Sequence, residues 1–240
     1  MAAIALILGI FAAALLYSSV GHGGGSGYIA MMALFNVAPE SIRPAALSLN
    51  ILVASIGTLR FYRAGSFSWS LFWPFALASV PCAFLGGTIT LPSTLYRQVL
   101  GVVLLLAAYR LFTKPVSDTS RGVPIPLALL CGAAIGLLSG LTGVGGGIFL
   151  SPLLVLTGWA NTKQSCGVSA AFILVNSIAG ILGLMTKGAT LPAELPYWTI
   201  AAIAGGLIGS ELGAKRLASP TLRRLLAVVL VIAALKLILI

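Results

Sequence analysis

Long apolar runs with almost no charge dominate this sequence, and the first of them covers residues 3–20. A helix needs about 20 consecutive apolar residues to cross a hydrocarbon core about 30 Å thick. Of the 240 residues, 59% belong to the set AVILMFWYC and 8% are charged, whereas soluble domains are about 25% charged. The composition therefore predicts an integral membrane protein and excludes a soluble globule, a disordered chain and a disulfide scaffold.

Helices are the predicted form of these runs, because lipid offers no hydrogen-bond partner to an open backbone. The runs are continuous rather than alternating, which excludes a transmembrane barrel. The predicted fold is an all-α polytopic membrane protein, expected in the bacterial inner membrane with the lipid bilayer around it. The net charge of +10 comes without a dense basic run, so we expect it to set orientation in the membrane rather than to bind nucleic acid.

An internal duplication is the second constraint on the fold. Three stretches of the first half recur in the second half at an offset of 122 to 126 residues: 21–25 at 143–147, 51–56 at 173–178, and 97–111 at 223–237. The first pair is the most specific, because both members end in three consecutive glycines. We predict two homologous transmembrane repeats, residues 1–118 and 119–240, which together form one membrane domain.

Each repeat is predicted to contain a long run, a glycine cluster, a short run, a polar loop and three membrane spans. In the first repeat these runs, the loop and the spans lie at 3–20, 28–37, 38–43, 44–61, 69–89 and 96–112. In the second repeat they lie at 126–142, 148–156, 158–164, 165–185, 197–213 and 222–239. A short run of about ten residues rises only about 15 Å, so it cannot cross the membrane.

Two arrangements accommodate such a short run. In one, the long and short runs form a single broken crossing and the repeats are parallel. In the other, the pair dips into the membrane and returns to its own side, and the repeats are inverted. The first divides the 14 basic residues evenly between the two sides, and the second divides them 10 to 4. The positive-inside rule therefore favours inverted repeats with both termini outside. In that arrangement the smaller group is Arg43, Arg97, Lys187 and Lys236.

Clustered glycines are expected to break a membrane helix, because each one weakens it by about 1 kcal/mol relative to alanine. Transporters aim the N-termini of such half-helices at anions. Close helix packing is the plainer interpretation of glycine, and we assign it to two sets with four-residue spacing: Gly132, Gly136 and Gly140, and Gly205, Gly209 and Gly213. For the two clusters we favour an anion site, whose predicted members are Gly21, His22, Gly23, Gly24, Gly25 and Ser26 with Gly143, Gly145, Gly146 and Gly147.

Polar side chains on the spans that follow the loops complete the predicted substrate site: Ser48, Asn50, Ser169 and Asn176. Interhelical hydrogen bonding is the alternative role for each of them. His22 is the only histidine, and it could donate to an anion, carry a proton or make a structural hydrogen bond. Glu211 is a second candidate for proton coupling, although Lys215 four residues later predicts a helical ion pair. Arg43 opens a span and is predicted to be an interfacial arginine.

The remaining chemistry of the sequence is sparse. The three cysteines lie apart without a CxxC motif, so we predict no metal site and no cofactor. One histidine and four scattered acids offer no converging catalytic set, so the chain is not expected to be an enzyme. There is no GxxxxGK[ST] motif, which indicates transport driven by a gradient rather than by ATP.

The glycine motifs give the chain a family resemblance. Val20-Gly21-His22-Gly23-Gly24-Gly25-Ser26-Gly27 and Leu141-Thr142-Gly143-Val144-Gly145-Gly146-Gly147 each follow a hydrophobic run and precede a serine-bearing span. This layout resembles the TauE/SafE sulfite exporter family, also called the 4-toluene sulfonate uptake permease family. The resemblance implies a small duplicated transporter of sulfur-containing anions, with the glycine clusters and the Ser48 and Ser169 regions as its pathway. His22 departs from the apolar residue that is more common at its position in that family.

The sequence as a whole predicts a secondary transporter of sulfite, organosulfonates or thiosulfate, with the anion held where the two glycine breaks meet near the membrane midplane. An anion channel and a transporter of another small anion, such as a carboxylate, are the alternatives. The expected partner is a small anionic substrate, and a homodimer is compatible with the sequence.

Overall fold

The computed structural model describes residues 2–89, 105, 109 and 122–239, and each regular element in this part of the chain is a helix. The first half contributes α1 (Ala2–Ser19), α2 (Gly25–Leu34), α3 (Pro39–Arg63) and α4 (Trp69–Thr88). The second half contributes α6 (Ile125–Thr142), α7 (Gly147–Thr157), α8 (Thr162–Met185), α9 (Leu195–Glu211), the π-helical turn η1 (Leu212–Arg216) and α10 (Ser219–Leu239). The predicted span at 96–112 lies almost wholly outside the described residues.

Five of the described helices are long and apolar enough to cross a membrane: α1, α3, α4, α6 and α8. The helices that directly follow the glycine clusters, α2 and α7, have only 10 and 11 residues, too few to span. The prediction of an all-α polytopic membrane protein is therefore confirmed. The predicted span at 197–213 corresponds to the 17-residue α9, which η1 continues by one turn.

Two of the predicted polar loops are shorter than the sequence suggested. The loop at 38–43 is helical from Pro39, because proline is well tolerated in the first turn of a helix and Glu40 complements the helix dipole there. The loop at 158–164 gives way to α8 at Thr162. Asn161 and Gln164 form a capping box at that point, in which each side chain pairs with the other's main-chain N–H. Both corrections lengthen a helix at its N-terminal end.

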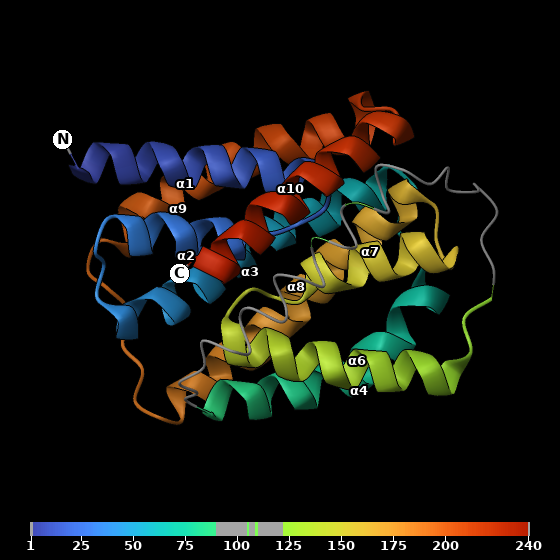
Figure 1. Ribbon diagram of the computed structural model, residues 1–240, viewed down its shortest axis with the longest axis horizontal. Helices are drawn as coiled ribbons and strands as arrows, with labels where there is room; N and C mark the ends of the chain where they lie inside the picture. The colour runs from blue at the N-terminus through green and yellow to red at the C-terminus, as the bar shows by residue number, and fades with distance from the viewer. Residues whose placement is uncertain (1, 90–104, 106–108, 110–121, 240) are drawn as a thin grey trace.

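The short helix α2 folds back along α1 rather than continuing it. A Cβ placed on Gly27 would lie 2.8 Å from that of Ala13, and one placed on Gly9 would meet the side chain of Met31. The pairing is therefore antiparallel, and α2 returns toward the end where the chain begins (Figure 1). This hairpin corresponds to the predicted arrangement in which the long and short runs dip in and return, and it does not form a single broken crossing.

An ion pair shows which helix ends share a side of the molecule. Arg60, near the end of α3, lies 2.6 Å from Glu211, and Lys215 lies 2.9 Å from the same carboxylate. The predicted ion pair between Glu211 and Lys215 is confirmed. In the parallel arrangement Arg60 and Lys215 would lie on opposite sides of the membrane, so this contact disagrees with it.

Two helix pairs are held together by glycine faces. Gly205, Gly209 and Gly213 approach the backbone of α1 at Phe11, Leu15 and Ser19. Gly132, Gly136 and Gly140 approach the backbone of α4 at Phe75, Ser79 and Ala83. The packing role predicted for these glycines is confirmed, because small residues let helix backbones approach closely. In each pair, the helix that opens one half packs on a span of the other half.

The helices α3 and α8 occupy the middle of the molecule, between the α1–α9 pair and the α4–α6 pair (Figure 1). Gly57 of α3 faces Ala170 of α8, and Leu47 of α3 faces Gly180 of α8. The two helices therefore run antiparallel. They are also the longest of the helices that the structure describes, with 25 and 24 residues, so their midpoints mark the middle depth of the bundle.

Candidate functional site

The helical structure is interrupted at both glycine motifs, and glycines with positive φ angles lie at these interruptions. The first break covers residues 20–24 between α1 and α2, and the second break covers residues 143–146 between α6 and α7. Five glycines in them have positive φ angles: Gly21 (74°), Gly24 (100°), Gly143 (76°), Gly145 (88°) and Gly146 (80°). A residue with a side chain pays about 1–2 kcal/mol in this region of backbone space, so the turn that starts each short helix depends on glycine.

Each break ends at a helix start whose N–H groups have no side-chain cap. Gly24 and Gly146 are the N-cap residues of α2 and α7, and neither position has a side-chain hydrogen bond. Within the described part of the chain, no acceptor pairs with the N–H groups of Gly24, Gly25, Gly145 or Gly146. Such groups at a helix start can hold an anion, helped by the positive end of the helix dipole.

The two breaks lie against each other halfway along α3 and α8. A Cβ placed on Gly23 would lie 2.6 Å from Oδ1 of Asn50, and one placed on Gly145 would lie 3.1 Å from Nδ2 of the same side chain. Ile173 lies against Gly23, Gly145 and Gly147 in the same way. Asn50 is near the midpoint of α3 and Ile173 near the midpoint of α8. We call this meeting point of the breaks the junction.

Asn50 also ties the two halves together. Its Nδ2 donates to the main-chain oxygen of Val144 across 3.2 Å. Gly25 of the first half faces the same oxygen, at 2.8 Å from a Cβ placed on it. No larger residue would fit between Asn50 and Val144 at that position, so the glycine of the motif is required by the close approach of the two halves.

His22 starts a second chain of contacts between the halves. Its Nε2 lies 2.9 Å from the hydroxyl of Ser151 on α7, which donates across 2.7 Å to the hydroxyl of Ser169 on α8. Ser165 donates to the main-chain oxygen of Ser151. All four side chains are buried. The structure therefore brings His22 and Ser169 together, as members of one hydrogen-bonded chain that joins the first break to α7 and α8.

Several buried polar atoms near the junction have no partner among the described residues: Nδ1 of His22, Oδ1 of Asn50, Oδ1 of Asn176 and Oγ of Ser177. The amide of Asn176 is oriented by its donation to the main-chain oxygen of Phe172. Oγ of Ser177 lies 3.1 Å from a Cβ placed on Gly145. A buried polar atom without a partner is costly, so these atoms mark a place where a ligand or a water molecule would be stabilised.

The other predicted glycines line the same region. A Cβ on Gly21 would meet the backbone of Cys166 on α8, and Gly146 lies against Phe172. Gly143 lies against the side chain of Arg43. Ser26 is buried in the first turn of α2. The short helices are thus fixed against α3 and α8 on several sides.

Two predicted site residues lie away from the junction. Ser48 is half-buried and donates to the main-chain oxygen of Pro44 on its own helix, 2.9 Å away. Its hydroxyl is therefore engaged in the helix rather than in the space between the breaks. Glu211 is held in its ion pairs with Arg60 and Lys215 at one end of the bundle, and none of its contacts reaches a break.

Arg43 has a structural role that the sequence did not indicate. Its guanidinium donates to the main-chain oxygens of Ile89 (3.0 Å) and Gly86 (2.6 Å) at the end of α4, and to that of Gly140 on α6. It thereby satisfies carbonyls that the end of a helix leaves unpaired. Because its stem also packs on Gly143, Arg43 fastens the second break to two helices instead of standing as a simple interfacial charge.

Ser151 was missed by sequence reasoning, although it is central to the contacts of His22. The available signal was its place as the single polar residue in the apolar run 148–156. The run has no counterpart serine in the first half, where Ile29 stands at the equivalent position. Ser151 and His22 therefore differ from their counterparts in the other half, and each is the hydrogen-bond partner of the other.

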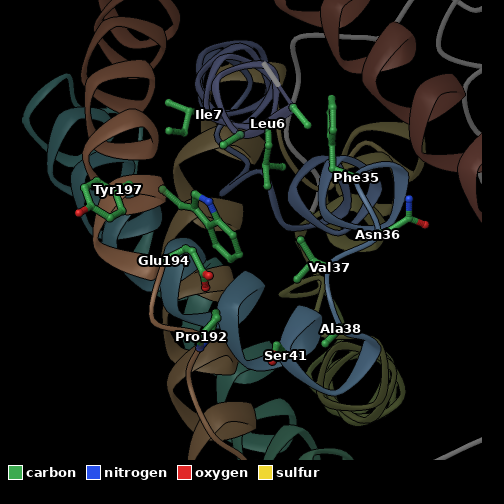
Figure 2. Close-up of a pocket in the computed structure, with 13 residues that line it drawn as sticks. Leu6, Ile7, Phe35, Asn36, Val37, Ala38, Ser41, Pro192, Glu194 and Tyr197 are labelled. Atoms are coloured by element: carbon green, nitrogen blue, oxygen red, sulfur yellow. The ribbon is translucent and has the colours of Figure 1, made fainter.

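A cavity of about 430 Å³ opens beside the start of α1 (Figure 2). Its wall combines residues from α1, the connection between α2 and α3, and the start of α9, with Leu6, Val37 and Trp198 among them. Glu194 is the single charged side chain among the 13 lining residues. None of the lining residues is a lysine or an arginine, and the carboxylate of Glu194 would repel an anion.

The fold and the junction define a class of protein, an integral membrane protein in which two broken helix hairpins face each other, as they do in secondary transporters. The chain belongs to the family described as sulfite exporter TauE/SafE, whose model matches residues 5–237. The resemblance inferred from the glycine motifs is confirmed. Proteins of this family are membrane transporters, and this chain is one of them.

Two relatives agree with this assignment. The "Probable membrane transporter protein y4hK" of Sinorhizobium fredii is 40% identical over 241 residues, which cover 98% of each chain. The "Probable membrane transporter protein MJ0441" of Methanocaldococcus jannaschii is 24% identical over 136 residues, which cover 55% of this chain and 51% of the relative. The bacterial source of the first agrees with an inner-membrane location. No solved structure matches the chain.

Proposed function

We propose that this protein is a secondary transporter that moves small sulfur-containing anions, such as sulfite, organosulfonates or thiosulfate, across the membrane. The anion would be held at the junction by main-chain N–H groups of Gly24, Gly25, Gly145 and Gly146. The observation that carries the proposal is the meeting of two uncapped helix starts at the midpoints of α3 and α8. Two positive dipole ends converge there without a buried lysine.

We further propose that the two halves are inverted repeats. The antiparallel α1–α2 hairpin and the contact between Arg60 and Glu211 support this topology. In secondary transporters, broken helices of inverted repeats place the substrate at the midplane, and one group of helices moves against the other around it. The junction residues are buried, so the anion would reach them when the short helices separate from α3 and α8.

Flux through the purified protein in liposomes tests the function. Vesicles that contain the protein and matched vesicles without it are exposed to sulfite, thiosulfate, ethanesulfonate and acetate, and internal anion is measured over time. We expect saturable uptake of at least one sulfur oxyanion through the protein. Uptake of acetate while every sulfur oxyanion fails would overturn the proposal, and uptake that rises linearly with concentration would indicate a channel.

A further inference from the structure

We infer that the species transported is a singly charged oxyanion that also carries a hydrogen-bond donor, an O–H or N–H group, rather than a dianion or an anion with acceptors alone. The inference rests on the proposed function and narrows its substrate class. It follows from two properties of the junction: the amount of positive charge that the protein places there, and the unpartnered acceptors beside it.

The positive charge available at the junction is small. The starts of α2 and α7 each carry the equivalent of roughly half a positive charge, and α1 and α6 end at the same breaks with the opposite partial charge. Among the described residues, Arg43 is the cationic side chain that packs on a break, and its guanidinium is engaged with the oxygens of Gly86, Ile89 and Gly140. The second negative charge of a dianion would therefore be buried without a compensating group, which is costly.

The main-chain donors of the junction would take the charged oxygens of the ligand. The N–H groups of Gly24 and Gly25 lie where the first break meets α2, and those of Gly145 and Gly146 belong to the second break. Charge-assisted hydrogen bonds from N–H groups to an anionic oxygen are stronger than neutral ones. These N–H groups would bind the charged oxygens of the ligand, but they leave the acceptor atoms beside them without a partner.

The acceptor of Asn50 is fixed in orientation. Its Nδ2 donates to the oxygen of Val144, so the oxygen of the amide, and not its NH₂ group, faces Gly23. That Oδ1 atom is fully buried and has no partner among the described residues. Oγ of Ser177, 3.1 Å from a Cβ placed on Gly145, also has no partner among the described residues, and its hydroxyl can accept or donate. At Oδ1 of Asn50, an oxyanion without a hydrogen would set acceptor against acceptor, whereas an O–H or N–H group would satisfy this atom.

The test uses three sulfonates in proteoliposomes that contain the wild-type protein. Hydroxymethanesulfonate and ethanesulfonate have the same number of heavy atoms, and only the first carries an O–H group. Methanedisulfonate is a dianion. We expect kcat/KM for hydroxymethanesulfonate to exceed that for ethanesulfonate by about tenfold or more, because a site that pairs a substrate hydroxyl rejects the analogue that lacks it. Methanedisulfonate is expected to be excluded. Equal rates for the hydroxyl and methyl compounds, or transport of the dianion, would overturn the inference.

Sulfite supplies an independent arm, because its singly protonated form and its dianion interconvert with pH. We expect the flux at constant total sulfite to follow the concentration of hydrogen sulfite as the pH is raised. Flux that follows the dianion instead would overturn the inference while leaving the proposed function intact. Failure of every sulfur oxyanion would instead be a failure of the proposed function, so the two results are distinct.

Variants of the junction test whether Asn50 causes the preference for hydroxymethanesulfonate over ethanesulfonate. Asn50→Leu is expected to bring the ratio of hydroxymethanesulfonate to ethanesulfonate transport close to one, and Ser177→Ala is expected to lower it in the same direction. Ser55→Ala is the matched control on the same helix, because Ser55 is exposed and donates to the oxygen of Ile51. A wild-type ratio in both junction variants would contradict the assignment of the acceptor.

Discussion

Asn50 of α3 donates a hydrogen bond to the main-chain oxygen of Val144, 3.2 Å away and 94 residues later in the chain. The contact links a helix of the first half to the glycine break of the second half. His22 and Ser151 make the reciprocal link, from the break of the first half to a helix of the second, across 2.9 Å. The two breaks are therefore held by side chains of the opposite halves, and relative motion of the halves would change both breaks together.

The link from His22 to Ser151 is expected to need a polar side chain rather than a titrating one. His22→Gln retains a donor for the Ser151 hydroxyl, so we expect this variant to keep most of the sulfite flux. His22→Val copies the residue of the second break, Val144, and leaves Ser151 with one partner fewer. A lost hydrogen bond of this kind costs about 1–2 kcal/mol, and flux is expected to fall with it.

Initial rates of sulfite uptake at several pH values measure both variants. The role of His22 in proton coupling stays a prediction, and the glutamine variant separates it from the hydrogen-bond role. Loss of the pH dependence of transport in His22→Gln, with the protein still folded, would favour proton carriage. Full flux in His22→Val would show that the contact with Ser151 is dispensable.

The turn at Gly146 is expected to tolerate no side chain. Its φ is 80°, and a Cβ there would lie 3.0 Å from Phe172 and 3.1 Å from Ile135. Gly158 has a similar φ of 72° with nothing within 4 Å of its Cβ position. An alanine there would therefore show the cost of the positive φ angle alone, without a steric clash. We expect Gly158→Ala to lose about 1–2 kcal/mol of unfolding free energy and to keep its flux.

Gly146→Ala is expected to lose more stability than its control and most of its sulfite uptake, because the added carbon displaces the start of α7 from the junction. Unfolding in detergent and uptake in liposomes measure the two effects. Equal behaviour of the two alanine variants would mean that the second break is not part of the transport path.

The sequence was sufficient to predict the helical membrane fold because that prediction depends on composition and run length. The two helix breaks could also be predicted, because consecutive glycines within a membrane segment strongly weaken a helix. The sequence predicts the starts of α3 and α8 several residues too far along the chain. Pro39 and Asn161 are residues that are common in polar loops, and their role at a helix start depends on local geometry. Those errors moved element boundaries without changing the topology.

The site was only partly predictable from sequence. His22, Asn50 and Ser169 could be selected because each is polar in an apolar setting. Ser48 has the same appearance, yet its hydroxyl bonds to its own helix at Pro44, and periodicity alone does not distinguish these cases. Ser151 and Arg43 have their roles through contacts with His22 and Gly140, respectively, and each of these contacts joins residues more than 90 positions apart in the sequence. Such contacts become visible only when the helices are packed.

The guanidinium of Arg43 is expected to be irreplaceable by an ammonium group. Three main-chain oxygens on α4 and α6 share its donors, and lysine cannot reproduce the planar fork that reaches them. We expect Arg43→Lys to lower the free energy of unfolding by about 2–3 kcal/mol, since hydrogen bonds from charged groups are individually strong. Arg63→Lys, at the exposed end of α3, is the matched control. Thermal unfolding of the purified variants in detergent compares them, and equal stability would show that the hydrogen bonds of Arg43 to α4 and α6 do not stabilise the fold.

Loop accessibility is expected to separate the inverted from the parallel arrangement. In a protein whose native cysteines, Cys82, Cys131 and Cys166, are replaced by alanine, single cysteines are placed near the helix ends. The inverted arrangement puts Ala38→Cys and Lys187→Cys on one face, and Ala64→Cys and Lys163→Cys on the other, as the antiparallel packing of α3 and α8 requires. The parallel arrangement instead pairs position 38 with 163 and position 64 with 187. Labelling of intact cells with a membrane-impermeant maleimide, compared with labelling after permeabilisation, identifies the outward face. Labelling of 38 together with 163 would overturn the inverted topology, and with it the proposed route of the anion between the two breaks.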